Sequence, residues 1–268
     1  FTKNASEALN LAANTLGAGL GPGDEVVISV MEHHSNIVPW QLLCQRTGAT
    51  LRWFDITDDG RLDLEQAAAT SLTWVSNVLG TRNPIAAIAA QAHAVGARMV
   101  VDASQAVPHQ ATDVVALGAD MVVFTGHKMV GPPGIGVLWG RYDLLAELPP
   151  FLGGGEMIEV VEMERSTYAP PPARFEAGTP PIAQAVGLGA AVDYLTGLGM
   201  DAIAAHEQEI TAYALAKLTD IDGLVILGPT EAVERGSATS FHLRGAHPHD
   251  VMQVRLQLPA TETFRYHA

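Results

Sequence analysis

Short apolar strands that alternate with helical segments constrain the fold of this chain more than any other feature of its sequence. The sequence predicts strands at 25–30, 51–56, 98–101, 121–124 and 134–138. A helix is predicted at 84–95, because proline opens it, alanine and isoleucine fill it, and Gly96 ends it. Strands joined through helices form parallel βαβ units. We therefore expect an α/β fold with a mostly parallel sheet, in which ligands bind at the carboxyl ends of the strands.

The chain changes character between residues 149 and 180, where runs of glycine and proline predict a long irregular segment. Such a segment is either a domain linker or an active-site loop. After it, helices are predicted at 182–198 and 200–218, and strands at 224–227 and 240–243. We therefore expect a large domain over residues 1–180 and a smaller α/β domain over residues 181–268.

The charge and the cysteine content exclude several classes of protein. The formal net charge is −14, whereas a nucleic-acid-binding protein needs a concentrated basic surface. No run approaches the roughly 18 apolar residues of a membrane span, and we expect neither a span nor a signal peptide. The single cysteine, Cys44, excludes an intrachain disulfide and favours a cytoplasmic location. Its apolar neighbours predict a buried core thiol.

A lysine follows one of the predicted buried strands directly. Lys128 ends the motif Phe124-Thr125-Gly126-His127-Lys128. Burial at a crowded sheet edge lowers a lysine pKa from its usual value of about 10.4. A neutral amine can then attack an aldehyde and form a Schiff base. The alternative is an exposed loop lysine without a chemical role.

Two polar residues follow the preceding strand in the same way. Asp102 ends the strand that starts at residue 98, and Gln105 comes three residues later. A carboxylate in this place can pair with the protonated ring nitrogen of pyridoxal phosphate and make the ring an electron sink. The Gln105 amide can donate a hydrogen bond to the ring hydroxyl. A strand-end aspartate that caps the next helix is the alternative.

Further stretches could hold an anion or a planar ring. Ser6 is predicted to cap a helix, and its hydroxyl could bind phosphate together with the first-turn amides, Thr125 and His127. An ordinary capped helix is the alternative. His33 could stack on a planar ring. A metal site at His33 and His34 is disfavoured, because neighbouring side chains diverge, and we expect no metal.

Taken together and in order, these motifs resemble the group II (SufS-type) cysteine desulfurases of the class V aminotransferase family. The matching stretches are MEHHSNIVPW (31–40), VSNVLG (75–80), VDASQAVPH (101–109), TGHK (125–128), GPPGIG (131–136), GGGEMI (153–158), RFEAGTP (174–180) and HPHDV (247–251). The resemblance implies the aspartate aminotransferase-like fold of the transferases that depend on pyridoxal 5′-phosphate (PLP).

The resemblance also implies which residues hold the ring of PLP. Lys128 would bind the cofactor covalently and move protons at the substrate. His33 would stack on the ring, Asp102 would pair with the ring nitrogen, and Gln105 with the ring oxygen. Lys128 and His33 are therefore the expected catalytic residues.

Further roles concern the phosphate and the substrate. The resemblance implies that Ser6, Thr125 and His127 bind the phosphate, and that Asn77 lies beside the ring and the substrate carboxylate. Thr179 would reach the phosphate in a partner subunit, which implies a homodimer.

The activity implied is the conversion of L-cysteine to L-alanine. The sulfur would leave as a persulfide on a catalytic cysteine and pass to a SufE- or SufU-like acceptor protein for iron–sulfur cluster assembly. A selenocysteine lyase, or another class V lyase or transaminase, is an alternative within the same fold. A non-catalytic scaffold of sulfur assembly is an alternative from another class.

The sequence departs from the family where the nucleophile is expected. The family carries it in an Arg-x-Gly-His-His-Cys-Ala loop, which should follow His249 but does not occur in these residues. The carboxylate-binding arginine expected after Thr261 is also missing. Either this loop is deleted, or it is mobile and was left out of the sequence. We also expect that one strand's worth of sequence is missing before Trp74, and that the N-terminal part of the large domain is missing before Phe1.

Overall fold

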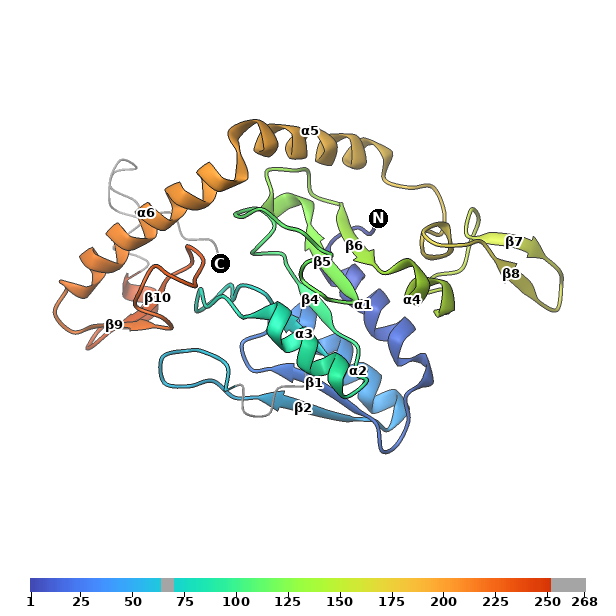
Figure 1. Cartoon of the computed structure of the whole chain (residues 1–268), viewed down its shortest axis with the longest axis horizontal. Coiled ribbons are helices and arrows are strands. Elements are labelled where there is room, and N and C mark those ends of the chain that lie inside the picture. The colour runs from blue at the N-terminus through green and yellow to red at the C-terminus, as the bar shows by residue number, and fades with distance from the viewer. Residues whose placement is uncertain (64–69, 252–268) are drawn as a thin grey trace.

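The computed structural model describes residues 1–63 and 70–251 of the chain (Figure 1). Its α-helices are α1 (Ala5–Leu16), α2 (Val38–Thr47), α3 (Ile85–Ala94), α4 (Tyr142–Glu147), α5 (Ile182–Leu198) and α6 (Met200–Thr219). Its strands are β1 (Glu25–Ser29), β2 (Thr50–Phe54), β3 (Ser71–Thr73), β4 (Val100–Asp102), β5 (Met121–Thr125), β6 (Gly136–Gly140), β7 (Ile158–Val161), β8 (Ser166–Tyr168), β9 (Leu224–Leu227) and β10 (Ser240–Leu243).

The central sheet has the strand order β3-β4-β5-β6. Strands β3, β4 and β5 run parallel, as the alternating pattern predicts, so the expected α/β fold is confirmed. Strand β6 runs antiparallel to β5, because a short loop without a crossover helix joins the two. The parallel pair β1-β2 continues the sheet, since the Thr70 N–H donates a hydrogen bond to Val27 O at 2.7 Å.

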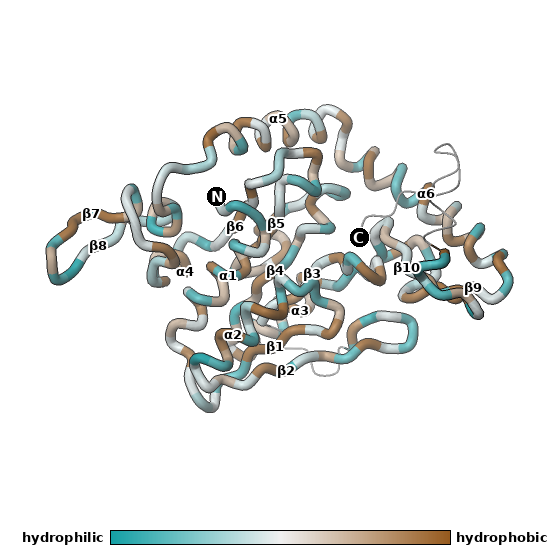
Figure 2. The backbone as a smooth tube through the Cα atoms, turned by 180° about the vertical axis from the view of Figure 1, so that it is seen from behind, coloured by the Kyte–Doolittle hydropathy of each residue, from teal (hydrophilic) through white to brown (hydrophobic). Residues whose placement is uncertain are grey.

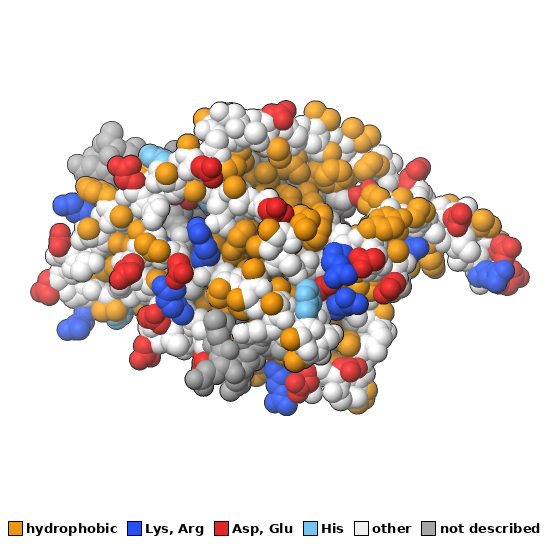
Figure 3. Space-filling view, in the orientation of Figure 1, with side chains coloured by type: hydrophobic (Ala, Val, Ile, Leu, Met, Phe, Trp, Pro, Cys, Tyr) orange, Lys and Arg blue, Asp and Glu red, His pale blue; other side chains and the backbone are white. Residues whose placement is uncertain are grey.

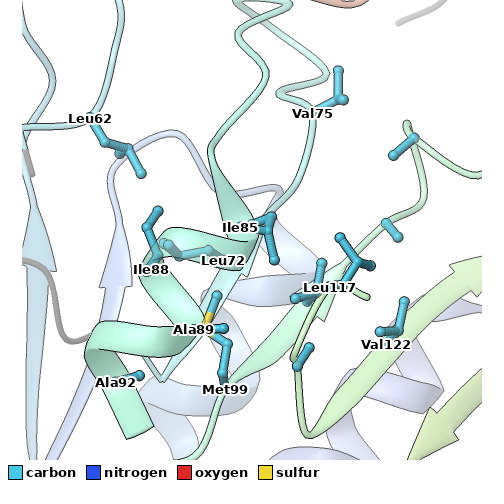
Figure 4. Packing of buried hydrophobic residues seen from close by; sticks show 14 of the residues in the cluster. Leu62, Leu72, Val75, Ile85, Ile88, Ala89, Ala92, Met99, Leu117 and Val122 are labelled. Carbon is cyan, nitrogen blue, oxygen red and sulfur yellow. The ribbon is translucent and has the colours of Figure 1, made fainter. Parts of the chain in front are cut away.

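Two hydrophobic clusters cover opposite faces of this sheet. On one face, α3 packs Ile85, Ile88 and Ala92 against Leu72 of β3 and Met99, all 2% exposed or less (Figure 4). Full burial of an aliphatic side chain of this size stabilises a fold by about 1.5–3 kcal/mol. The side chains that α1 and α2 pack onto the other face include Leu9, Ala12, Trp40 and Leu43. Cys44 lies in this second cluster and is buried, as predicted.

The prediction of an irregular segment over 149–180 is wrong in part. Residues 158–168 form a β-hairpin, β7-β8, which projects from the sheet layer (Figure 1). Figure 2 shows a hydrophobic β7 that leads to a hydrophilic tip. The glycine and proline runs on both sides of the hairpin obscure its short apolar strand in the sequence.

The chain beyond this hairpin follows the predicted elements closely. Helix α5 packs Leu188 and Leu195 on Met129 and Ile135, which follow β5. Helix α6 then leads to the antiparallel pair β9-β10, with Leu224 opposite Leu243. In residues 1–63 and 70–251, no helix is long and apolar enough to cross a membrane.

A short strand directly precedes Trp74, where the sequence suggests that a strand's worth of residues is missing; whether residues are missing there stays a prediction. Residues Ser71–Thr73 form β3 and pair in parallel with β4, with Ser71 opposite Val100. All three residues are buried, because β3 lies between β1 and β4. A strand this short left too little apolar pattern to be read from the sequence. The expected site of the catalytic-cysteine loop, after His249, lies mostly outside the described residues.

Candidate active site

Two strand ends bring a lysine and an aspartate to the same edge of the sheet. Asp102 is the last residue of β4, where it pairs with Val123 of the parallel neighbour β5. Lys128 lies in a one-turn 3-10 helix, Gly126–Lys128, directly after β5. Asp102 is buried, and its Oδ1 accepts the Ser104 N–H at 3.0 Å. The sheet edge predicted from the sequence therefore carries both groups.

The surroundings of Lys128 favour its neutral form. Burial lowers the pKa of Lys128, and the nearby negative charge of Asp102 opposes part of this effect. The side chain is half-buried and therefore not closed off from solvent. A half-buried amine with a lowered pKa is suited to nucleophilic attack on a carbonyl group.

His33 belongs to the same electrostatic group. Burial lowers the pKa of His33, and the positive charge of Lys128 lowers it further, while Asp102 acts in the opposite direction. Its Nδ1 accepts the Ser35 N–H at 3.1 Å, so the proton of the neutral ring is on Nε2. A neutral, flat imidazole thus lies within the electrostatic reach of both Lys128 and Asp102.

Close backbone contacts shape the turn that carries Lys128. A Cβ at Gly126 would lie 2.8 Å from Ile135 Cγ2, so only glycine allows the approach of these two segments. The backbone of Val130 has a φ of 54°, a left-handed conformation that β-branched residues rarely adopt. Such strain often gathers at functional sites, where the surrounding structure enforces it.

The start of α1 lies against β6. Thr2 forms a β-bridge with Gly136, and a Cβ at Gly136 would lie 2.5 Å from the backbone of Asn4. Ser6 is exposed in the first turn of α1, and its hydroxyl lies 2.5 Å from that of Ser35. Because Ser35 also contacts His33, this contact links the start of α1 to the histidine.

The prediction that Ser6 caps α1 is wrong. The N-cap is Asn4, whose Oδ1 accepts the Glu7 N–H at 3.0 Å. The helix begins at Ala5, two residues earlier than a Ser6 cap would place it, so Ser6 lies inside it. Its hydroxyl still lies in the first turn of α1, and the start of a helix favours anions.

The remaining predicted site residues lie at different places relative to Lys128, Asp102 and His33. Thr125 is buried, and its Oγ1 lies 3.0 Å from His127 Nδ1, next to Lys128. Gln105 and Asn77 are half-buried, in the turns that follow β4 and β3. Thr179 lines a surface pocket together with Phe1, Lys3 and Glu7, next to the start of α1.

Sequence reasoning missed three polar residues at this edge. Glu32 is buried next to His33, Ser35 contacts both Ser6 and His33, and Ser104 has a buried hydroxyl next to Asp102. Ser104 Oγ has no hydrogen-bond partner among residues 1–63 and 70–251. All three lie inside the motifs that were read, but their burial and contacts are not visible in the sequence.

Comparisons with known proteins agree on one family. Residues 1–256 match the family described as "Aminotransferase class-V". The chain is 62% identical to a probable cysteine desulfurase of Streptomyces coelicolor over 267 residues, which cover 95% of the chain and 64% of that protein. It is 51% identical to a cysteine desulfurase of Dickeya dadantii over 261 residues, covering 94% of the chain and 63% of that protein. The chain therefore spans less than two thirds of the length of these relatives.

Solved structures share the fold. The apo cysteine desulfurase of Thermococcus onnurineus NA1 superimposes with a TM-score of 0.87 at 37% identity, over 96% of this chain and 66% of that one. The cysteine desulfurase CsdA of Escherichia coli gives a TM-score of 0.87 at 32% identity, over 96% and 65%. A mutant of C-DES, with glycine covalently linked to its PLP cofactor, gives a TM-score of 0.80. At 23% identity, that last likeness shows the fold alone.

Proposed function

Because the chain belongs to the aminotransferase class-V family, we propose that it is the cofactor-binding part of a PLP-dependent cysteine desulfurase. One observation carries this proposal: the half-buried amine of Lys128 and the buried carboxylate of Asp102 stand at the ends of adjacent parallel strands. They are close enough for the Asp102 charge to alter the pKa of Lys128. The relatives named as cysteine desulfurases support the reaction.

The residues at the sheet edge fit PLP in their chemistry. The cofactor carries an aldehyde, a basic ring nitrogen and a phosphate, and the site offers an amine, a carboxylate and the start of a helix. The Ser104 hydroxyl is buried without a partner in the described part of the chain, so it is free to bond to a group placed there. The neutral ring of His33 suits a flat aromatic partner.

When bound, PLP supplies an electron sink for reactions at the α-carbon of an amino acid. The lowered pKa of Lys128 keeps a fraction of its amine neutral, so that this residue can hold the aldehyde and later move a proton at the substrate α-carbon. Asp102 would hold the proton of the ring nitrogen, and Gln105 would bind the ring oxygen. His33 would cover the ring face and exclude water from it.

The other predicted residues complete the proposed site. Ser6, Thr125 and His127 would hold the phosphate near the start of α1. Asn77 would face the substrate carboxylate. Thr179 is exposed, which suits its predicted role in the active site of a partner subunit.

A homodimer is part of the same proposal. Helix α5 exposes five large apolar side chains, Ile182, Val186, Val192, Tyr194 and Leu198, between 44% and 71% accessible. Figure 3 shows hydrophobic side chains gathered along this helix and the surface next to it. A second copy of the chain would bury them. We place the domain boundary at residue 180, before this helix, and we place the protein in the cytoplasm.

We propose L-cysteine as the substrate, L-alanine as the product, and a SufE- or SufU-like protein as the acceptor of the sulfur. The sulfur is taken by an attacking thiolate, and Cys44 is unsuited to supply one. Its side chain is buried, and burial raises the pKa of its thiol. The proposed activity therefore needs a cysteine other than Cys44.

The small number of lysines makes the proposal easy to test. The chain has three, Lys3, Lys128 and Lys217. After addition of PLP and reduction with borohydride, we expect mass spectrometry to find the cofactor on Lys128. Lys128→Ala should lose the cofactor absorbance band, and Lys217→Ala, on the exposed surface of α6, should keep it. Labelling of Lys3 or Lys217 instead, or an unchanged band in Lys128→Ala, would contradict the proposed site.

A further inference from the structure

A second buried carboxyl group lies next to the proposed site. Glu32 follows β1, directly before the turn that carries His33, and it is 6% exposed. Its Oε1 lies 2.6 Å from Ser29 Oγ, and its Oε2 accepts a hydrogen bond from Asn36 Nδ2 at 2.6 Å. The role proposed above for the site does not use this side chain.

The partners of Asn36 decide which Glu32 oxygen can carry a proton. Asn36 Oδ1 accepts hydrogen bonds from Trp40 Nε1 at 3.0 Å and from Ser71 Oγ at 2.6 Å, so its amide nitrogen must face Glu32. Glu32 Oε2 therefore acts as an acceptor. A proton on Oε1 can bond to Ser29 Oγ, and a neutral carboxylic acid satisfies both contacts.

Strand β3 connects Glu32 to Asp102. Glu32 accepts a backbone hydrogen bond from Thr73, the residue of β3 that pairs with Asp102 of β4. Neighbouring strands are about 4.8 Å apart. The two carboxyl groups thus lie on adjacent segments of the same sheet edge, and the hydrogen bonds of Asn36 and Thr73 hold the His33 turn against β3.

Ionisation of Glu32 is opposed from two sides. Burial is the largest effect, and the charge of Asp102 adds to it, so that together they raise the pKa of Glu32 to about 8 although three hydrogen bonds favour the charged form. Asp102 is the charged group that acts on Glu32 from another strand. On the adjoining turn, His33 interacts with Lys128, Asp102 and His34.

Building on the proposed function, we propose that Glu32 is a positioning residue that holds the His33 turn against β3 and, as a neutral acid, places no second negative charge beside Asp102 at the cofactor ring. When two carboxyl groups share a buried site, a negative charge on one opposes the ionisation of the other. A neutral Glu32 adds no second negative charge beside Asp102 and does not compete with it for a positively charged partner.

The titration of the bound cofactor tests this division of roles. The full 268-residue chain is loaded with PLP, and its absorbance is recorded between pH 6 and pH 10 for wild type, Glu32→Gln and Glu147→Gln. Glutamine imitates the neutral acid and cannot ionise, and Glu147 is an exposed control on α4. In wild type, ionisation of Glu32 near pH 8 adds negative charge and favours the protonated chromophore. We expect the Glu32→Gln midpoint to be lower by about one pH unit, as for two interacting charges in a partly buried site.

The outcomes separate this proposal from the proposed function. Glu147→Gln should titrate like wild type, and an equal midpoint in Glu32→Gln would overturn the role of Glu32. Failure of Glu32→Gln to fold at pH 6 would also overturn it, since the amide and the neutral acid are equivalent there. If wild type shows no cofactor absorbance band that depends on Lys128, the proposed function is contradicted instead. In that case, urea unfolding of the cofactor-free chain still tests the role of Glu32. Above pH 5, the free energy of unfolding of wild type should fall relative to that of Glu32→Gln. If it does not fall, Glu32 is charged in the fold and the proposal is overturned.

Discussion

The pH dependence of folding stability is the sharpest consequence of the buried Glu32. The perturbation is the substitution Glu32→Gln, compared with wild type at several pH values in the absence of cofactor. Glutamine keeps the size of the side chain and an acceptor for Asn36 Nδ2, and its amide can donate to Ser29 Oγ. The two proteins should therefore differ chiefly in the ability of residue 32 to ionise.

The magnitude follows from the pKa of Glu32 in the two states. Burial raises this pKa from 4.5 in the unfolded chain to about 8 in the fold. Below pH 4.5 both states hold the proton, and the stabilisation from protonated Glu32 is fully present. As pH rises toward 8, only the unfolded state releases the proton, so wild type loses about 1.4 kcal/mol of stability per pH unit. Up to about 5 kcal/mol is lost once the pH exceeds the folded-state pKa.

Urea unfolding between pH 5 and pH 8 measures this loss. The fluorescence of the four tryptophans reports the transition, because Trp40 lies buried in the core. Between these two pH values, the free energy of unfolding of Glu32→Gln should rise by about 3–4 kcal/mol relative to that of wild type. Glu147→Gln, on the surface, should show no such trend. If the free energies of unfolding of wild type and Glu32→Gln change with pH in the same way, the reasoning is refuted. If wild type becomes more stable relative to Glu32→Gln as the pH rises, the pKa of Glu32 is lowered by folding and not raised.

Three further predictions test the site and the fold. Asp102→Asn should bind PLP about 10- to 100-fold more weakly in a spectroscopic titration, because a charge-assisted hydrogen bond is replaced by a neutral one; unchanged affinity would exclude Asp102 as the ring partner. Asn4→Ala removes the N-cap of α1 and should lower the free energy of unfolding by about 1 kcal/mol in urea, whereas Ser6→Ala should leave it nearly unchanged. Leu72→Ala leaves a cavity between α3 and the sheet and should cost about 2–5 kcal/mol, and a cost below 1 kcal/mol would contradict the packing in Figure 4.

Much of the fold could be predicted because its elements carry local signals. Helix 182–198 and strands 224–227 and 240–243 begin and end where their apolar patterns predict. The hairpin β7-β8 and the three-residue strand β3 were missed, since each is too short to show a period of its own. The antiparallel direction of β6 depends on the loop after Lys128, which lacks the crossover helix that a parallel strand needs.

The order of motifs along the sequence was enough to identify Lys128 and Asp102 as the central pair, because residues at the ends of adjacent parallel strands meet at one edge. Their assigned roles, like those of the other predicted site residues, stay predictions. Only the tertiary structure showed that Asn4 rather than Ser6 caps α1, that Thr179 lines a pocket with Lys3 and Glu7, and that Glu32 is buried. Burial and hydrogen bonds join segments distant in the chain, here Glu32 with Thr73 and Asn36 with Ser71. A local pattern cannot contain such contacts, because they exist only once the sheet has assembled.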